Sequence, residues 1–180
     1  MLRFYTFMII SYSEIYKNDI IQLADKAFGI DFINHDFIHQ NAENIHICTN
    51  NNHELTGFTI EEKFPLSDFK QTFRLNFPDY GIKDIKILKT IAVDNKYRKK
   101  GFGKKLIKSF IDRNRNNFLA SPVWLYPQQN LNIILDKFGF EPVKFLPNYW
   151  YDDSIKKQYK CKICNHPPCC CAAILFLKTP

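Results

Sequence analysis

The sequence predicts one domain of mixed α and β structure, built around a β-α-β crossover. Two β-rich runs, Ile85 to Val93 and Pro122 to Tyr126, flank an amphipathic helical pattern from Gly103 to Asn114. A strand, a helix and a second strand in this order are typical of a crossover connection. With 180 residues, 46% of them hydrophobic and 24% charged, the chain is long enough for one packed core. We therefore expect a single domain over residues 1–180.

The start of the chain predicts a strand followed by two helices. Met1 to Ile10 is aromatic and β-branched. It is shorter than the roughly 20 apolar residues of a membrane span and lacks the small-residue cleavage site of a signal peptide. We therefore expect a first strand in a cytoplasmic protein without a membrane partner. A helical stripe then runs from a cap near Asn18 to Ala27 and stops at Gly29, and a second short helix is expected over Asp31 to Ile38.

The remaining elements follow from the same periodicities. A hairpin joins two short β-rich runs across an asparagine-rich turn. The insert over residues 63–84 is either a mobile loop or the site of a short helix. Beyond the crossover we expect one more helix and two final strands. The ranges are 44–49 and 55–60 for the hairpin, 68–73 for the insert helix, Gln128–Phe138 for the last helix, and Phe140–Trp150 and Ala172–Leu177 for the last strands.

A basic glycine turn joins the central strand to the crossover helix. Gly101 and Gly103 remove Cβ atoms that would obstruct a phosphate, and the helix start offers unpaired N–H groups and partial positive charge. The net charge of the chain is +7, and six basic residues lie between Arg98 and Lys108. Because these basic residues lie in one short segment, they suit a small polyphosphate better than a long nucleic acid. We therefore expect no nucleic-acid partner. The simpler alternative is a glycine turn before a helix with a solvated basic face.

Three motifs in order resemble the GCN5-related N-acetyltransferase (GNAT) superfamily. The first is similar to the signature R/Q-x-x-G-x-G/A, the second to an Asn that opens a helix ending in Gly-Phe, and the third to the Asn-Tyr-Tyr of several members. The resemblance covers residues 85–177 and implies the GNAT fold, an α/β fold with a central mixed, mostly antiparallel sheet flanked by helices. The motifs are Arg98-x-x-Gly101-x-Gly103, Asn130 with Gly139-Phe140, and Asn148-Tyr149-Trp150.

The resemblance also implies how acetyl-CoA would bind as co-substrate. Backbone groups of Ile91, Ala92 and Val93 would hold the pantetheine arm, and Asn130 would lie near the pantetheine or its thiol end. An amine would attack the thioester directly, and a backbone N–H of the strand would stabilise the oxyanion. The amides of the glycine turn would hold the pyrophosphate, and they belong to Arg98, Lys99, Lys100, Gly101, Phe102, Gly103 and Lys104.

The proton-transfer residues depart from the family pattern. Many relatives have a Tyr four residues before the Gly of Gly-Phe, where this chain has Leu135. We therefore assign the general acid to Tyr149, for which the alternative is a packed aromatic with a satisfied hydroxyl. Two other tyrosines are reserves, and three carboxylates are candidates for a base that acts through water. These are Tyr126 and Tyr151, and Glu61, Glu62 and Asp84.

Five of the six cysteines lie between residues 161 and 171, and the sixth is Cys48. A Cys-x-x-Cys turn presents two thiolates together, and alternation along a strand puts two further sulfurs on one face and Cys170 on the other. Four sulfurs would converge as a structural zinc site, and the resemblance implies that this loop borders the acceptor cleft and so shapes acceptor choice. The alternatives are free thiols packed as small apolar groups, or a redox pair. The zinc ligands would be Cys161, Cys164, Cys169 and Cys171, and the redox pair would be Cys161 and Cys164.

These observations lead to one functional expectation and one rival. We expect an acyltransferase that moves acetyl from acetyl-CoA to a primary amine, which is a protein N-terminus, a lysine or a small amine. Asn148-Tyr149-Trp150 favours peptide-like acceptors. The rival is a non-catalytic module of the same fold that binds CoA or a partner, and the Leu135 substitution favours it.

Overall fold

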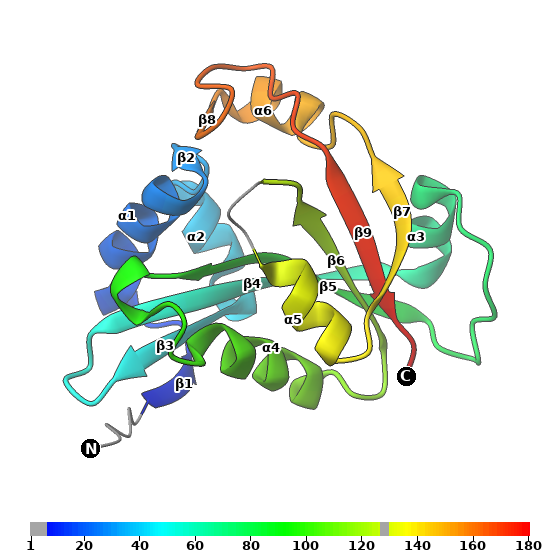
Figure 1. Cartoon of the computed structure of the whole chain (residues 1–180), viewed down its shortest axis with the longest axis horizontal. Helices are drawn as coiled ribbons and strands as arrows, with labels where there is room; N and C mark the ends of the chain where they lie inside the picture. The colour runs from blue at the N-terminus through cyan, green and yellow to red at the C-terminus, as the bar shows by residue number, and fades with distance from the viewer. Residues whose placement is uncertain (1–6, 127–129) are drawn as a thin grey trace.

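The computed structural model describes residues 7–126 and 130–180, and within them the chain forms a seven-stranded sheet (Figure 1). The strand order is β1-β3-β4-β5-β6-β9-β7. Neighbouring strands are antiparallel except for the central pair, β5 and β6, which is parallel. The strands are β1 (Phe7–Ser11), β3 (Ile45–Asn50), β4 (Leu55–Pro65), β5 (Asp84–Val93), β6 (Phe118–Trp124), β7 (Glu141–Leu146) and β9 (Ala173–Lys178). A second, small sheet pairs β2 (Gly29–Ile30) with β8 (Lys160–Cys161).

Helices cover both faces of the large sheet because strand side chains alternate between faces. On one face, α1 and α2 pack on β3 and β4, and α3 packs on β5 and β6. On the other face, α4 and α5 pack on residues such as Leu88, Leu119 and Val123 (Figure 1). The α-helices are α1 (Lys17–Ala27), α2 (His35–Asn41), α3 (Leu66–Phe73), α4 (Phe102–Arg113), α5 (Leu131–Lys137) and α6 (Tyr151–Lys157). The short 3₁₀ helices are η1 (Glu14–Tyr16), η2 (Ala42–Asn44) and η3 (Asn95–Tyr97).

The parallel pair β5–β6 is short and then opens. Within the described residues, its register runs from Ile85 opposite Phe118 to Ile87 opposite Ala120, although both strands continue beyond these positions. The strands then diverge (Figure 1). Just past the last pair, the buried Ser121 hydroxyl donates to the Leu88 carbonyl at 3.1 Å. A side chain thus replaces a ladder hydrogen bond where the sheet opens.

Most of the predicted elements are confirmed. The crossover, the hairpin, the helix within the insert and the last strand lie within a few residues of the expected ranges. The expected first strand and last helix begin at positions 1–6 and 128–129, which lie outside the described residues; their described parts are β1 and α5. No helix in the two described ranges combines the length and hydrophobicity needed to cross a bilayer.

Two predictions of local structure are wrong. The strand expected over 140–150 ends at Leu146, because Pro147 lacks an N–H and Asn148 adopts a left-handed φ of 51°. Helix α6 follows instead and was not predicted. The first helix begins at Lys17, directly after η1, so Asn18 lies inside the helix and does not cap it.

We expect Ser121→Ala to lower the free energy of unfolding by about 1–3 kcal/mol, because it leaves the Leu88 carbonyl buried without its hydroxyl donor. The measurement is urea unfolding. The matched control is Ser67→Ala, whose hydroxyl bonds Asp68 at the surface and whose loss changes stability by less than about 0.5 kcal/mol. Equal effects of the two substitutions would contradict this account of the open sheet.

Candidate active site

The glycine turn between β5 and α4 has the shape of an anion cradle. Asp94 accepts from the Lys96 amide at 2.8 Å and so starts the turn. Gly101, at φ +90°, is the N-cap of α4, and this left-handed conformation favours glycine. A Cβ at Gly101 would have no atom within 4 Å among the described residues, so open space lies before the helix start. The first N–H groups of α4 have no acceptor within the helix and point toward this space.

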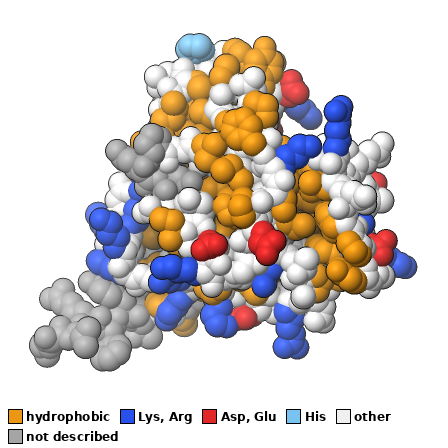
Figure 2. Space-filling model, turned by 45° about the vertical axis from the view of Figure 1, so that its right-hand side comes forward, with side chains coloured by type: hydrophobic (Ala, Val, Ile, Leu, Met, Phe, Trp, Pro, Cys, Tyr) orange, Lys and Arg blue, Asp and Glu red, His pale blue; other side chains and the backbone are white. Residues whose placement is uncertain are grey.

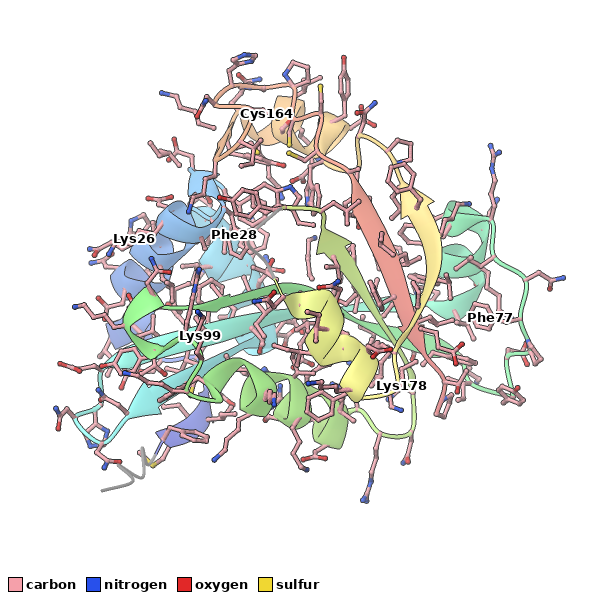
Figure 3. The ribbon with its side chains drawn as sticks, in the orientation of Figure 1. Lys26, Phe28, Phe77, Lys99, Cys164 and Lys178 are labelled. Atoms are coloured by element: carbon pink, nitrogen blue, oxygen red, sulfur yellow. The ribbon has the colours of Figure 1, made fainter. Side chains whose placement is uncertain are left out.

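The charges of the turn also suit an anion. The side chains of Arg98, Lys99 and Lys104 are exposed, and Figure 3 labels Lys99 in the turn. Arg98 Nε donates to the Val93 carbonyl at 3.0 Å, which ties the turn to the end of β5. The first turn of α4 has no acidic residue, so its lysines oppose the helix dipole. The lysines therefore destabilise the start of the helix, and a bound anion would offset this effect by balancing their charge.

The other predicted turn residues divide between surface and core. Lys100 is exposed, and its Nζ lies 5.5 Å from the centre of the Tyr97 ring. Phe102 is buried and packs against Phe7 and Tyr97, with ring centroids 5.2 and 5.4 Å apart. Its side chain anchors the helix start, so a ligand would meet its backbone. Gly103 is half-buried, and a Cβ there would lie 3.8 Å from a Val93 methyl group.

The end of β5 borders the opening in the sheet. Ile91, Ala92 and Val93 pair with β4 on one side, and the pairing of β5 with β6 has ended before them. The β6-side edge of this segment is therefore not used by sheet pairing, although the Val93 carbonyl already accepts from Arg98 Nε. Asn130 is exposed at the N-cap position of α5, and its carbonyl accepts from the Ile134 amide at 3.3 Å. The turn follows the open end of β5, and Leu131, next to Asn130, lines the cavity; the binding roles of these residues stay predictions.

A cavity of about 70 Å³ occupies the opening between β5 and β6. This volume is enough for a few water molecules. Its β5 wall includes Lys89, Thr90 and Ile91, and its β6 wall includes Ser121 and Trp124. The rest of the wall consists of side chains from the residues around β2 and β8, from the starts of α5 and α6, and from the loop before β9. These are Phe28, Phe32, Leu131, Trp150, Tyr159, Cys161 and Cys169.

Tyr149 lies in the turn between β7 and α6, not in a strand as predicted. Its amide donates to the Cys171 carbonyl at 3.0 Å, and its ring packs edge-on against Trp150 at 4.9 Å. Burial, together with the carboxylates of Glu62 and Asp153, raises the pKa of Tyr149 to about 12. The phenol is therefore protonated at neutral pH. Trp150, its neighbour, lines the cavity.

The other tyrosines differ in their access to the cavity. Tyr126 stacks on Trp124 at 5.3 Å, and Tyr151 is exposed at the start of α6. Tyr159 lines the cavity, is 2% exposed, and its hydroxyl has no hydrogen-bond partner within the described part of the chain. Sequence reasoning missed Tyr159, because its place depends on the small sheet, which local patterns did not predict.

The three candidate carboxylates lie in different places. Glu61 is buried and is bound by Arg113 and by Asn114 Nδ2, the latter at 2.9 Å, on the α4 side of the sheet. Asp84 pairs with Lys63 at 2.8 Å, at the beginning of β5 and far along the strand from the opening. Glu62 pairs at 3.1 Å with Lys89, which lines the cavity. Glu62 is therefore the carboxylate best placed to act through water.

Four cysteine sulfurs converge above the cavity, as predicted. The Sγ atoms of Cys161, Cys164, Cys169 and Cys171 all lie within 4.8 Å of one another, and Figure 3 labels Cys164 in this loop. Cys170 is exposed and lies beside the Pro168 carbonyl instead. Cys169 and Cys171 thus point to one side and Cys170 to the other, as in a strand, although these residues precede β9.

Comparison with solved structures gives the class of fold. No protein-family model matches the chain, and none of the curated proteins matches its sequence. Arabidopsis thaliana NAA60 with acetyl-CoA is similar at a TM-score of 0.70 and 15% identity, over 96% of this chain and 98% of that chain. The chain therefore has the GNAT fold, and the predicted fold class is confirmed.

Two further structures have the same fold. The ribosomal-protein-S18-alanine N-acetyltransferase of Escherichia coli gives a TM-score of 0.62 at 16% identity, over 96% of this chain and 92% of that chain. Arabidopsis thaliana Naa50 with the bisubstrate analogue CoA-Ac-MVNAL gives 0.65 at 15% identity, over 97% and 99%. At these identities the likeness concerns the fold.

We expect the double substitution Lys99→Ala/Lys104→Ala to weaken acetyl-CoA binding about 3- to 30-fold, because two exposed charge pairs contribute about 0.3–1 kcal/mol each. The thermal midpoint should hold or rise, since Lys104 opposes the helix dipole. Isothermal titration calorimetry measures the affinity. Lys137→Ala/Lys156→Ala, at the ends of α5 and α6, is the control with the same loss of charge. Equal weakening by both pairs would refute a localised cradle.

Proposed function

We propose that this protein is an N-acetyltransferase that moves the acetyl group of acetyl-CoA to an amine. One observation carries the proposal: a basic turn and the N-terminus of α4 directly follow the part of β5 that no longer pairs with β6. A pyrophosphate fits the cradle, and an extended arm fits the strand edge. The solved structures of the same fold support this, since one of them holds acetyl-CoA and another a CoA-peptide analogue.

The chain's own groups account for the donor side of the reaction. Amides from Arg98 to Lys104 would hold the pyrophosphate, and the backbone of Ile91 to Val93 would hold the pantetheine arm. The amine attacks the thioester carbonyl, so a C–N bond forms and the C–S bond breaks. A backbone N–H of β5 that faces the gap would stabilise the oxyanion that develops between these events.

We assign proton transfer to two groups that contact cavity-lining residues, Tyr149 beside Trp150 and Glu62 beside Lys89. We propose Tyr149 as the acid that protonates the leaving thiolate, because its raised pKa keeps it protonated at neutral pH. We propose Glu62 as the base that takes the amine proton through water, because it is the candidate carboxylate that pairs with a cavity-lining residue. The Tyr159 hydroxyl, which has no partner among the described residues, would donate a hydrogen bond to the acceptor and so position it.

A peptide N-terminus is the acceptor class that we favour. The cavity is narrow and has aromatic walls, which suits the end of a chain. Exposed hydrophobic side chains lie nearby on β7 and α6, namely Phe145, Tyr151 and Ile155. Figure 2 shows hydrophobic side chains in a band that descends from the top of the molecule, where α6 and the cysteine loop lie. One of the similar structures is a ribosomal-protein-S18-alanine N-acetyltransferase, and another holds the bisubstrate analogue CoA-Ac-MVNAL.

The test is an acceptor panel with acetyl-CoA: peptides differing in the first residue, the same peptides with a blocked N-terminus and a free lysine, and small amines. Thiol release and the mass gain of one acetyl group are measured together. Acetylation of free N-termini supports the full proposal, and transfer to lysine or small amines overturns the acceptor class alone. Tight acetyl-CoA binding without any transfer would favour the non-catalytic module, which the buried Leu135 also favours.

We expect Tyr149→Phe to lower kcat about 100-fold with little change in acetyl-CoA affinity, because general acids contribute about 10²- to 10⁴-fold. Stopped-flow thiol release and calorimetry give the two numbers. Tyr80→Phe serves as the control, since Tyr80 is exposed beside Phe118. Unchanged turnover would remove Tyr149 from the mechanism.

The pH profile separates the acceptor classes. An amine must lose its proton to attack, so kcat/KM should rise with pH through the pKa of the acceptor, about 8 for an N-terminus and about 10.4 for lysine. Tyr149 has its pKa raised to about 12 and stays protonated below that. Activity should therefore show no descending limb up to about pH 10. A fall between pH 8 and 9 would show that a different acid is used.

A further inference from the structure

The four convergent sulfurs have the spacing of a tetrahedral metal site. Four sulfurs bound to zinc at about 2.3 Å lie about 3.8 Å from one another. Cys171 Sγ lies 3.8 Å from Cys161 Sγ and 3.7 Å from Cys164 Sγ, and Cys164 Sγ lies 4.0 Å from Cys169 Sγ. We propose that these four thiolates bind one zinc ion, and that the ion holds the acceptor-side wall of the cavity in place.

Other sulfur chemistry fits the spacing less well. A disulfide brings two sulfurs to about 2.05 Å and involves only one pair. Here Cys171 is almost equally far from two partners, as expected for sulfurs around a common centre. An iron–sulfur cluster inserts several atoms between its cysteines, and the 4.8 Å span is too small for that. A tetrahedral site with four sulfurs and no open position suits structural zinc.

The backbone of the Cys-x-x-Cys turn is arranged to support a thiolate. The Ile163 amide points at Cys161 Sγ from 3.5 Å, and the Asn165 amide donates to the Cys161 carbonyl at 2.7 Å. The first contact offers a donor to a charged sulfur, and the second closes the turn that places Cys164 beside it. The two cysteines are thus positioned for one ion.

The loop has little else to order it. Between residues 158 and 172, the buried residues are Tyr159, Cys161 and Cys169. The remainder is mostly polar, charged or proline, and fixing such a segment costs conformational entropy that so few apolar contacts do not offset. Metal binding to four side chains supplies the missing free energy and releases the four thiol protons.

The site connects directly to the cavity wall. Cys161 pairs with Gly29 in the β2–β8 sheet, and the Lys162 amide donates to the Phe28 carbonyl at 2.8 Å. A Cβ at Gly29 would lie 1.9 Å from the Lys160 carbonyl oxygen, so glycine is required for this close approach. Phe28 lines the cavity, and Figure 3 labels it below the loop that carries Cys164. An ion at the cysteines therefore fixes the residues that border the acceptor.

The same site reaches α6 on its other side. The Cys169 amide donates to Ser154 Oγ at 2.7 Å, and Ser154 Oγ donates to the Tyr151 carbonyl at 2.8 Å. Cys161 and Cys169 themselves line the cavity, beside Trp150 and Tyr159. Because four sulfurs fill the coordination sphere, the ion takes no part in the chemistry. It is a structural link between β2, β8, α6 and the start of β9.

The metal is tested on the full chain, purified under reducing conditions without added metal, by elemental analysis and native mass spectrometry. We expect one zinc per chain, and after its removal we expect cobalt(II) to bind with the visible spectrum of a tetrahedral tetrathiolate site. Iron in place of zinc, or failure of the reduced chain to take up either zinc or cobalt, would overturn the proposal. Neither readout depends on enzymatic turnover, so this test can fail while the proposed activity stands.

Two cysteine variants locate the site. Cys164→Ser should lose the stoichiometric zinc, and Cys170→Ser, one residue from two ligands but exposed, should keep it. Equal zinc loss in both variants would contradict the assignment of ligands. If Cys164→Ser does not fold, the cobalt spectrum of the unaltered chain still decides the matter.

The structural role has a kinetic signature, which rests on the proposed function. Removing zinc from the wild type with a chelator should raise the KM for a peptide acceptor at least tenfold and leave acetyl-CoA affinity within about twofold, because the cradle lies on a different part of the molecule. Adding zinc back should restore KM. An equal loss of both affinities would mean that the ion supports the whole fold, and would overturn its specific role at the acceptor wall.

Discussion

The early separation of β5 from β6 is the constraint on which the rest of the structure depends. A parallel pair that continued to the end of both strands would satisfy its backbone groups within the sheet and leave nothing for a ligand. Here the pairing ends at Ile87 and Ala120, and the Ser121 hydroxyl bonds the Leu88 carbonyl where the strands separate. The strand edge beyond it stays available, and the helix that follows β5 begins beside that edge. The open end of β5 and the cavity beside it thus both follow from the early end of the hydrogen bonding between β5 and β6, and α4 begins next to them.

The two sides of the opening are stabilised in different ways. The side that we propose for the donor is built from a turn and a helix start, which the local sequence specifies and which the buried Phe102 of α4 anchors. The side that we propose for the acceptor is built from a loop with few buried residues, whose amides donate to the Phe28 carbonyl after α1 and to Ser154 Oγ of α6. Structural zinc contributes about 10–16 kcal/mol in small peptides, more than the roughly 5–9 kcal/mol expected from burying three side chains. A metal on the acceptor side would explain how a polar loop forms a defined wall.

Sequence reasoning succeeded where the signal is local and failed where contacts between distant segments decide. The glycine turn before α4 and the convergence of the four cysteines were predicted correctly because both depend on residue types and spacing within a short segment. Helix α6 was missed although Pro147 and Asn148 are turn-forming residues. The β2–β8 pair was missed because two-residue strands have no periodicity to recognise. Tyr159 was missed for the same reason, since that pair carries it to the cavity.

The sequence by itself determined the class of fold, the basic glycine turn before α4 and the four sulfurs that converge. Each of these depends on residues close together in the chain, where backbone geometry and alternation dictate what a spacing means. The tertiary structure alone decided which acidic and phenolic groups lie near the cavity. Glu61 and Glu62 are adjacent in sequence, yet strand alternation and the α4 partners bury one in an ion pair and leave the other beside Lys89. Such choices are made by packing between segments far apart in the chain, and no local pattern encodes them.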